Sequence, residues 1–111
     1  MCGILGIINK NYSVEELTEK IRLMGSIQDH RGPDAWGECI FPGIALGHNR
    51  LSIIDHEGGT QPMYSFCSNI IVVFNGEIYN HIYLRNLLAG KGYKFKSDHS
   101  DTETIVNGYL E

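Results

Sequence analysis

The chain begins with the residues MCGILGII, numbered 1–8. From Gly3 to Ile8 this stretch is short and almost entirely apolar, which is typical of a buried strand that starts at the N-terminus itself. Cys2 stands directly before that strand. Cysteine is small enough for removal of the initiator methionine to be plausible, and the mature chain would then begin with Cys2.

The next 40 or so residues predict a helix and then a hairpin. Ser13 and Glu16 form a capping-box pattern that predicts a helix over about Val14–Gly25. The apolar face of this helix would carry Leu17, Ile21 and Met24. The stretch HRGPDAWG, residues 30–37, is expected to be a loop because of its Gly, Pro and Asp content. Beyond it, the pattern predicts a hairpin with strands at Glu38–Phe41 and Ile44–Arg50 and a turn at Pro42-Gly43.

The second half of the chain also predicts both strands and helices. A β-branched run predicts a fully buried strand over Asn69–Phe74, which Asn75-Gly76 ends. Asn80 is expected to cap a helix that stops at Gly90–Gly92, and Tyr93–Lys96 is predicted as a short strand. The apolar residues of that helix would be Ile82, Leu87 and Leu88. The predicted fold class is therefore α+β.

The last residues predict the start of another helix. Ser100 and Glu103 repeat the capping-box pattern, and apolar residues follow at helical spacing up to Glu111. No glycine, proline or basic last turn closes this helix. We therefore expect residues 1–111 to be part of a longer protein, and to be marginally stable or to associate with a second copy when alone.

Composition excludes several classes of protein. The 111 residues suffice for one small domain, and 42% apolar with 20% charged residues is ordinary globular composition. The net charge of -4 argues against nucleic acid as a partner. No apolar run is long enough for a membrane helix, and no secretion signal is present. Three cysteines without metal-ligand spacing argue against a disulfide framework and a zinc site, and favour a reducing cytoplasm.

Cys2 is the first candidate for chemistry. Without Met1, one residue would carry both a thiol and an α-amine, with reference pKa values of about 8.5 and about 7.7–8.0. Moving the proton from sulfur to nitrogen would then cost on the order of 1 kcal/mol, so the amine could act as the base for its own nucleophile. The alternative is that Cys2 is a small buried hydrophobe. Cys39 and Cys67 are interpreted as packing or surface residues.

A thiol that attacks an amide needs hydrogen-bond donors for the oxyanion. Asn75 and Gly76 can supply a side-chain amide and a backbone N–H, although Asn-Gly is also a common hairpin turn. Arg50, at the end of an apolar strand, has the fork that fits a carboxylate. With Glu77 and Asp101 near other strand ends, one cation and two anions suit a free amino acid, although ordinary surface charge explains the same spacing.

Other polar residues are interpreted as structural. Arg31 and Asp34 are expected to pin their own loop rather than touch a substrate. The histidines show no metal-ligand spacing, so no metal site is predicted from His30, His48, His56, His81 and His99.

Six ordered motifs together carry a family resemblance: MCGILGI, HRGPDAWG, GHNRLSIID, QPM, FNGEIYNH and SDTE. They run from Met1 to about Thr104 and resemble the class II, N-terminal-nucleophile glutamine amidotransferases. The likeness is greatest to the glutaminase domain of glutamine-dependent asparagine synthetases. Related sugar-phosphate and phosphoribosyl amidotransferases typically differ at Pro33 and in the stretch after Asn-Gly.

The resemblance implies roles for particular residues. Cys2 would be the nucleophile with its α-amine as base, and Asn75 and Gly76 would form the oxyanion hole. Arg50 would bind the glutamine α-carboxylate, while Glu77 and Asp101 would hold the α-ammonium and side-chain amide region. The pocket would be lined by the backbone of Leu51, Ser52, Ile53 and Ile54.

The resemblance also implies an architecture. The fold would be the αββα sandwich of the N-terminal-nucleophile hydrolases, with residues 1–111 forming only the N-terminal part of the glutaminase domain. An ATP-dependent synthetase domain would normally follow, so ATP and magnesium are expected there and no cofactor is assigned within this chain.

The function that this implies is hydrolysis of glutamine to glutamate and ammonia, with the ammonia supplied to asparagine synthesis from aspartate. One alternative is a relative that amidates another acceptor, such as a surface-polysaccharide or secondary-metabolite precursor. Another is a non-catalytic module that binds glutamine or packs against a partner. The expected partners are glutamine, the synthetase domain and, for a homodimer, a second copy.

Overall fold

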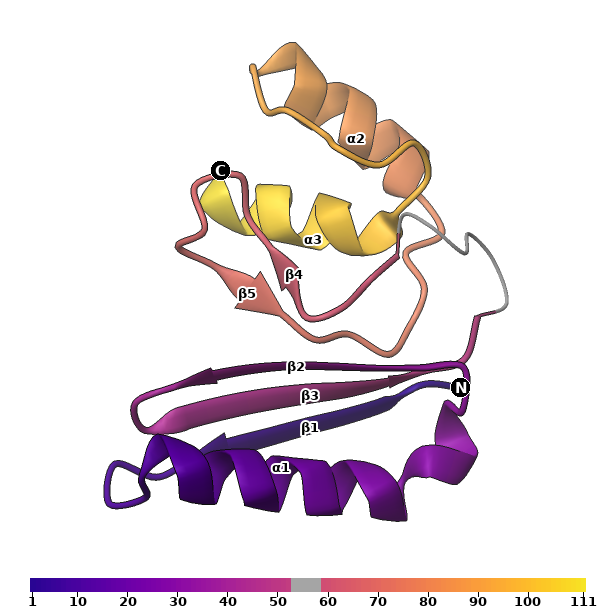
Figure 1. Ribbon diagram of the computed structural model, residues 1–111. Helices are drawn as coiled ribbons and strands as arrows, with labels where there is room; N and C mark the ends of the chain where they lie inside the picture. Colours follow the sequence, from indigo (N-terminus) through magenta and orange to yellow (C-terminus); the bar gives the residue numbers. More distant parts are fainter. Residues whose placement is uncertain (53–58) are drawn as a thin grey trace. The chain divides into compact units, whose positions relative to one another are not determined.

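A computed structural model describes residues 1–52 and 59–111 of the chain. The chain divides into two compact units, Met1–Ser52 and Ile53–Glu111. Both units combine helices with antiparallel strands, so the predicted α+β class is confirmed (Figure 1).

The first unit is built on a three-stranded antiparallel sheet. Its strands are β1 (Gly3–Ile8), β2 (Ala35–Phe41) and β3 (Ile44–Arg50), in the order β1-β3-β2. The predicted hairpin between β2 and β3 is confirmed, and Gly43 in its turn has a φ of 82°, which favours glycine. The long β3 strand therefore occupies the centre and positions its last residue, Arg50, between the two edge strands.

Helix α1 (Val14–Ile27) covers one face of this sheet (Figure 1). The predicted capping box is present, because Ser13 Oγ accepts from the Glu16 amide and the Glu16 carboxylate accepts from the Ser13 amide. Leu17 and Ile21 of α1 are fully buried and pack with two sheet residues, Leu5 and Ala45, to form the core. Burial of each large aliphatic side chain contributes about 1.5–3 kcal/mol to folding. Met24, predicted on the same face, is partly exposed instead.

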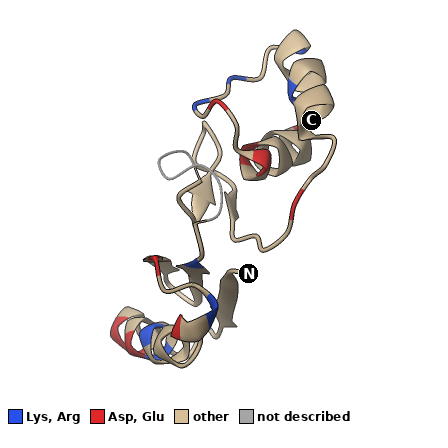
Figure 2. Ribbon diagram, turned by 90° about the vertical axis from the view of Figure 1, so that its right-hand side faces the viewer, with Lys and Arg blue, Asp and Glu red and all other residues tan. Residues whose placement is uncertain are grey.

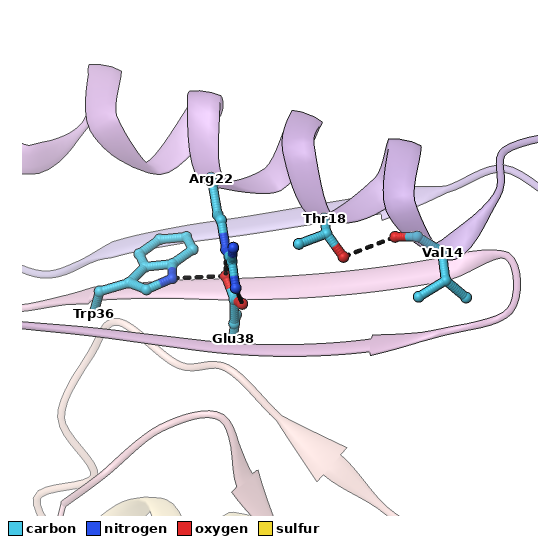
Figure 3. A network of polar contacts seen from close by, with 5 residues as sticks. All are labelled: Val14, Thr18, Arg22, Trp36 and Glu38. Carbon is cyan, nitrogen blue, oxygen red and sulfur yellow. Dashed lines mark hydrogen bonds and ion pairs between the residues drawn. The ribbon is translucent and has the colours of Figure 1, made fainter.

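Trp36 and Arg22 attach α1 to the edge strand β2. A Cβ on Gly25 or Gly47 would lie within 2.6 Å of the Trp36 ring, so both glycines make room for the indole. The indole N–H donates to the Glu38 carboxylate at 2.9 Å, and the Arg22 guanidinium forms an ion pair with the same carboxylate at 2.5 Å (Figure 3). The Arg22 hydrogen bond is the main reason that the pKa of Glu38 lies below its usual value.

Residues 30–37 are less irregular than predicted. A 3₁₀ turn covers Asp29–Arg31, and Ala35–Gly37 already belong to β2. The strand extends this far because Ala35, Trp36 and Gly37 pair in register with Arg50, Asn49 and His48. Only residues 32–34 form the expected loop.

The second unit contains a two-stranded sheet and two helices. Strands β4 (Met63–Tyr64) and β5 (Ile71–Val72) are antiparallel, and α3 (Asp101–Leu110) packs against both. Helix α2 (His81–Gly90) packs in turn against α3 (Figure 1). Among the described residues, no helix is long and apolar enough to cross a membrane.

Two predictions for this unit were wrong about strands. Of Asn69–Phe74 only Ile71–Val72 is a strand, and the run is half-buried or exposed rather than fully buried. The amides at its ends are taken by side chains, since Ile70 donates to Ser65 Oγ at 3.2 Å and Phe74 donates to Gln61 Oε1 at 2.5 Å. Similarly, Tyr93–Lys96 is irregular, because Glu103 rather than a neighbouring strand accepts from the Lys96 amide.

The helix predictions for this unit were closer. Helix α2 begins after Asn80 and ends at Gly90 as expected, but the Asn80 side chain makes no capping hydrogen bond and only Leu88 is buried. In α3, Ser100 Oγ accepts from the Glu103 amide. The Glu103 carboxylate does not complete the predicted capping box, because it binds the amides of Lys96 and Ser97 and the Ser97 hydroxyl.

Candidate functional site

Cys2 lies at the N-terminal end of β1, next to the segment that follows β3. Its half-buried Sγ accepts from the Leu51 amide at 3.4 Å and lies 3.8 Å from the Leu51 carbonyl oxygen. Both contacts are with backbone groups of one residue, so the main chain of Leu51 sets the position of the sulfur. The structure therefore places Cys2 where a nucleophile would be held by backbone groups.

Arg50, the last residue of β3, lies close to Cys2. In the β1–β3 ladder Gly3 is opposite Asn49, so Cys2 directly precedes the first paired residue of β1 and Arg50 directly follows its partner on β3. The predicted nucleophile and the predicted carboxylate-binding residue, 48 positions apart in sequence, thus share one end of one sheet.

The loop before β2 joins these two positions. Arg31 Nε donates to the Cys2 carbonyl oxygen at 3.3 Å, and Asp34 Oδ2 accepts from the Ser52 amide at 2.6 Å. Arg31 and Asp34 thus make structural hydrogen bonds, in agreement with the predicted pinning of their loop, and their partners are segments that are distant in sequence. This loop therefore binds the backbone of Cys2 and of Ser52 through its Arg31 and Asp34 side chains.

Gly32 explains how this loop can come so close. A Cβ on Gly32 would lie 2.3 Å from the carbonyl oxygen of Asn49 and 2.6 Å from the carbonyl carbon of Arg50. Both atoms are backbone, so no side-chain rotation could make room. The Asp34 amide also donates to the Arg50 carbonyl oxygen at 3.0 Å, which fixes the backbone at the end of β3.

Half of the predicted pocket-lining segment is described. The Leu51 amide donates to the Cys2 sulfur, and the Ser52 amide donates to Asp34. Ile53 and Ile54 lie outside the described residues.

In the second unit, the predicted oxyanion residues follow β5. Asn75 is half-buried, whereas Gly76 and Glu77 are exposed. A Cβ on Gly76 would lie 2.7 Å from the Phe74 ring, so the Phe74 side chain packs over the glycine backbone. This segment can therefore present an amide side chain and a backbone N–H close together.

Asp101 is the first residue of α3 and contacts the same segment. Its Oδ2 accepts from the Ile78 amide at 2.9 Å, two residues beyond Gly76. The first turn of α3 is acidic, with Asp101 and Glu103, and a helix N-terminus stabilises such charges (Figure 2). Within the second unit the structure thus brings the predicted ammonium-binding carboxylate to the loop that carries Asn75 and Gly76.

The remaining cysteines lie elsewhere, as predicted. Cys39 is buried in β2 and Cys67 is exposed in the turn between β4 and β5. Hydrogen bonding from Ser65, and then from the Asn69 amide, lowers the pKa of the Cys67 thiol. Thiol labelling of the chain will therefore not be specific for Cys2. Among the described residues, no group of three or more His, Cys, Asp or Glu is arranged to hold a metal ion.

Comparison with known proteins decides the family. A family model described as a glutamine amidotransferase domain matches residues 1–111. The chain belongs to this family. It is 42% identical over 111 residues to glutamine-hydrolysing asparagine synthetase 1 of Bacillus subtilis (strain 168), covering 98% of this chain and 17% of that protein.

Two further relatives agree with this assignment. A probable glutamine-hydrolysing asparagine synthetase of Schizosaccharomyces pombe is 40% identical, and asparagine synthetase B of Escherichia coli (strain K12) is 38% identical, each over the whole of this chain. The chain spans 20% of the length of both proteins. The family that the six motifs predicted is confirmed, and the glutamine amidotransferase region of these relatives is the part that the chain matches.

Proposed function

We propose that residues 1–111 are part of a glutaminase domain that hydrolyses glutamine with Cys2 as the nucleophile. The observation that carries this proposal is the Cys2 thiol, held at the Leu51 amide beside Arg50 at the end of the central strand.

In the proposed reaction, the Cys2 sulfur attacks the carboxamide carbon of glutamine. The tetrahedral intermediate collapses as the C–N bond breaks, and ammonia leaves with the proton taken from the thiol. Water then attacks the γ-glutamyl thioester, which releases glutamate and restores the thiol. With Met1 removed, the α-amine of Cys2 would carry the proton between these steps.

The substrate would be bound by its two charged ends. Arg50 would bind the α-carboxylate through its guanidinium, while Asp101, with Glu77, would accept hydrogen bonds from the α-ammonium. Asn75 and Gly76 would donate to the oxyanion of the tetrahedral intermediate, an interaction worth about 2.7–4 kcal/mol per donor in other enzymes. The contact of Asp101 with the Asn75–Ile78 segment supports this division of roles.

The architecture that we propose is the αββα sandwich of the N-terminal-nucleophile hydrolases. Each unit combines helices with an antiparallel sheet, which supports this architecture.

Asparagine synthesis is the proposed use of the ammonia. The relatives are named asparagine synthetases, and in a protein of their length an ATP-dependent synthetase domain would amidate aspartate with ATP and magnesium. We further propose a cytoplasmic setting, which three free thiols support, and assembly with that domain or with a second copy.

A glutamate-release assay on the full-length protein tests the proposal. Glutamate and ammonia in equal amounts, abolished by Cys2→Ala, are expected. A folded protein that binds glutamine without releasing glutamate would instead be a non-catalytic module. Replacing aspartate with other acceptors in the coupled reaction would separate asparagine synthesis from amidation of a different acceptor.

A further inference from the structure

The buried side chain of Gln61 connects two elements of the candidate site in the second unit. Its Oε1 accepts from the Phe74 amide at 2.5 Å, directly before Asn75, and its Nε2 donates to Thr102 Oγ1 at 3.4 Å, directly after Asp101. Gln61 is 9% exposed. The loop with the proposed oxyanion donors and the helix with the proposed ammonium-binding carboxylate are therefore joined through one side chain.

Thr102 links Gln61 to Asp101 by a second hydrogen bond. The Thr102 hydroxyl, which accepts from Gln61, donates to Asp101 Oδ1 at 3.4 Å, while Asp101 Oδ2 accepts from the Ile78 amide. In this series the Phe74 amide donates to Gln61, Gln61 donates to Thr102, and Thr102 donates to Asp101. The hydrogen bonds thus run in one direction from Phe74 through Gln61 and Thr102 to Asp101, with Ile78 bound at the other Asp101 oxygen.

The result is that the loop is held at both ends. Phe74 and Ile78 are the residues that flank Asn75–Glu77, and both of their amides donate to side chains of this series. Only a residue with an acceptor and a donor on one planar group can bind a backbone N–H and a hydroxyl oxygen as Gln61 does. Gln61 and Thr102, the two central members, are buried, and satisfied hydrogen bonds between buried groups rigidify the segments that they join.

We propose that Gln61 is a positioning residue of the glutaminase reaction. It binds the Phe74 end of the loop directly and the Ile78 end through Thr102 and Asp101, and this loop would place Asn75 and Gly76 toward the oxyanion. This inference rests on the proposed function, and it adds a residue that would touch neither glutamine nor the reacting atoms. Because oxyanion donors act in the transition state, loosening the loop is expected to lower kcat more than it raises KM.

The experiment uses the full-length protein and four single-residue variants. Gln61→Met keeps the side-chain length and removes both hydrogen-bonding groups. Thr102→Val removes only the hydroxyl, and Thr102→Ser restores it. Thr104→Val is the matched control, because Thr104 is equally buried on the same helix and its hydroxyl has no hydrogen-bond partner among the described residues.

We expect Gln61→Met to lower kcat for glutamine hydrolysis by about 10- to 100-fold, less than the loss of a donor itself, with KM changed less than about threefold. Thr102→Val should lower kcat in the same sense, Thr102→Ser should restore it, and Thr104→Val should leave it unchanged. Amide hydrogen exchange at Phe74 should become faster in Gln61→Met and in Thr102→Val but not in Thr104→Val.

Unchanged kcat in a folded Gln61→Met variant would overturn the inference, as would equal losses in Thr102→Val and Thr104→Val. If Gln61→Met does not fold, the two threonine variants decide by the same criteria. These failures differ from failure of the proposed function, in which the unaltered protein itself would release no glutamate.

Discussion

The Cys2 Sγ lies 3.4 Å from the amide nitrogen of Leu51, the residue that follows Arg50. This contact joins the N-terminal end of β1 to the C-terminal end of β3, so Cys2 and Arg50 belong to the same end of the first sheet. We expect substitutions of Cys2 or Arg50 to lower glutamine hydrolysis without unfolding the rest of the protein.

The first prediction concerns the thiol. Cys2→Ala in the full-length protein should abolish glutamine-dependent asparagine synthesis, whereas free ammonia should still support it, because the sulfur is needed only to release ammonia. Both activities are measured by product formation with each nitrogen source. Equal loss of the two activities in a folded variant would contradict this division of labour.

The second prediction concerns Met1. While Met1 is present, the nitrogen of Cys2 belongs to a peptide bond and cannot act as a base near neutral pH. A sample that retains Met1 or carries an N-terminal tag should therefore show no glutaminase activity. Intact-mass measurement gives the state of the N-terminus, and turnover by a sample that keeps Met1 would disprove the role of the α-amine.

The third prediction concerns Arg50. Arg50→Lys keeps the charge but loses the two-pronged geometry, so kcat/KM for glutamine should fall at least about tenfold, which corresponds to about 1.4 kcal/mol. Ammonia-dependent activity is the internal control and should be nearly constant. If kcat/KM for glutamine does not change, Arg50 does not bind the carboxylate.

The fourth prediction concerns Gly32. Gly32→Ala would place a methyl group 2.3 Å from the Asn49 carbonyl oxygen, and we expect a loss of about 1–3 kcal/mol in the free energy of unfolding. Gly108→Ala is the control, since a Cβ there meets no atom within 4 Å and alanine should stabilise the helix by up to about 1 kcal/mol. Urea unfolding followed by circular dichroism measures both. Similar effects of the two substitutions would contradict the close approach.

The fifth prediction concerns pH. The pKa of Glu38 is lowered below its usual 4.5, mainly by the Arg22 hydrogen bond, so this carboxylate stabilises the folded state fully above that pH. The stabilisation is lost as the pH falls through the lower, folded-state pKa. Glu38→Gln should therefore flatten the acid side of the stability curve, by a small amount because Arg22 is largely exposed. An unchanged acid dependence of the urea midpoint would contradict the assignment.

Local patterns were enough to predict much of the first unit. The β1 strand, the Ser13 cap and the turn at Gly43 depend on neighbouring residues, and each was found where the sequence placed it. The prediction of a strand over Asn69–Phe74 was wrong because residues outside this run decide its hydrogen bonds. Its amides are bound by the side chains of Gln61 and Ser65, and no periodicity in the run itself could reveal that.

The sequence predicted which residues belong to the candidate site but not how they are placed relative to one another within the first unit. The motifs identified Cys2 and Arg50 through a family resemblance, whereas their proximity follows from the β1–β3 register. The partners of Arg31 and Asp34, which are Cys2 and Ser52, could not be identified from the local sequence because they lie far along the chain. Gly32 between these two charged residues was the one local signal of a close backbone approach.

The indole of Trp36, set into the space left by Gly25 and Gly47, has a consequence for spectroscopy. It is the single tryptophan of these 111 residues and lies in the first unit, whereas five of the six tyrosines lie in the second. Tryptophan fluorescence of the chain therefore reports on the Met1–Ser52 unit alone. Its emission is an optical signal for whether that unit opens independently of residues 59–111.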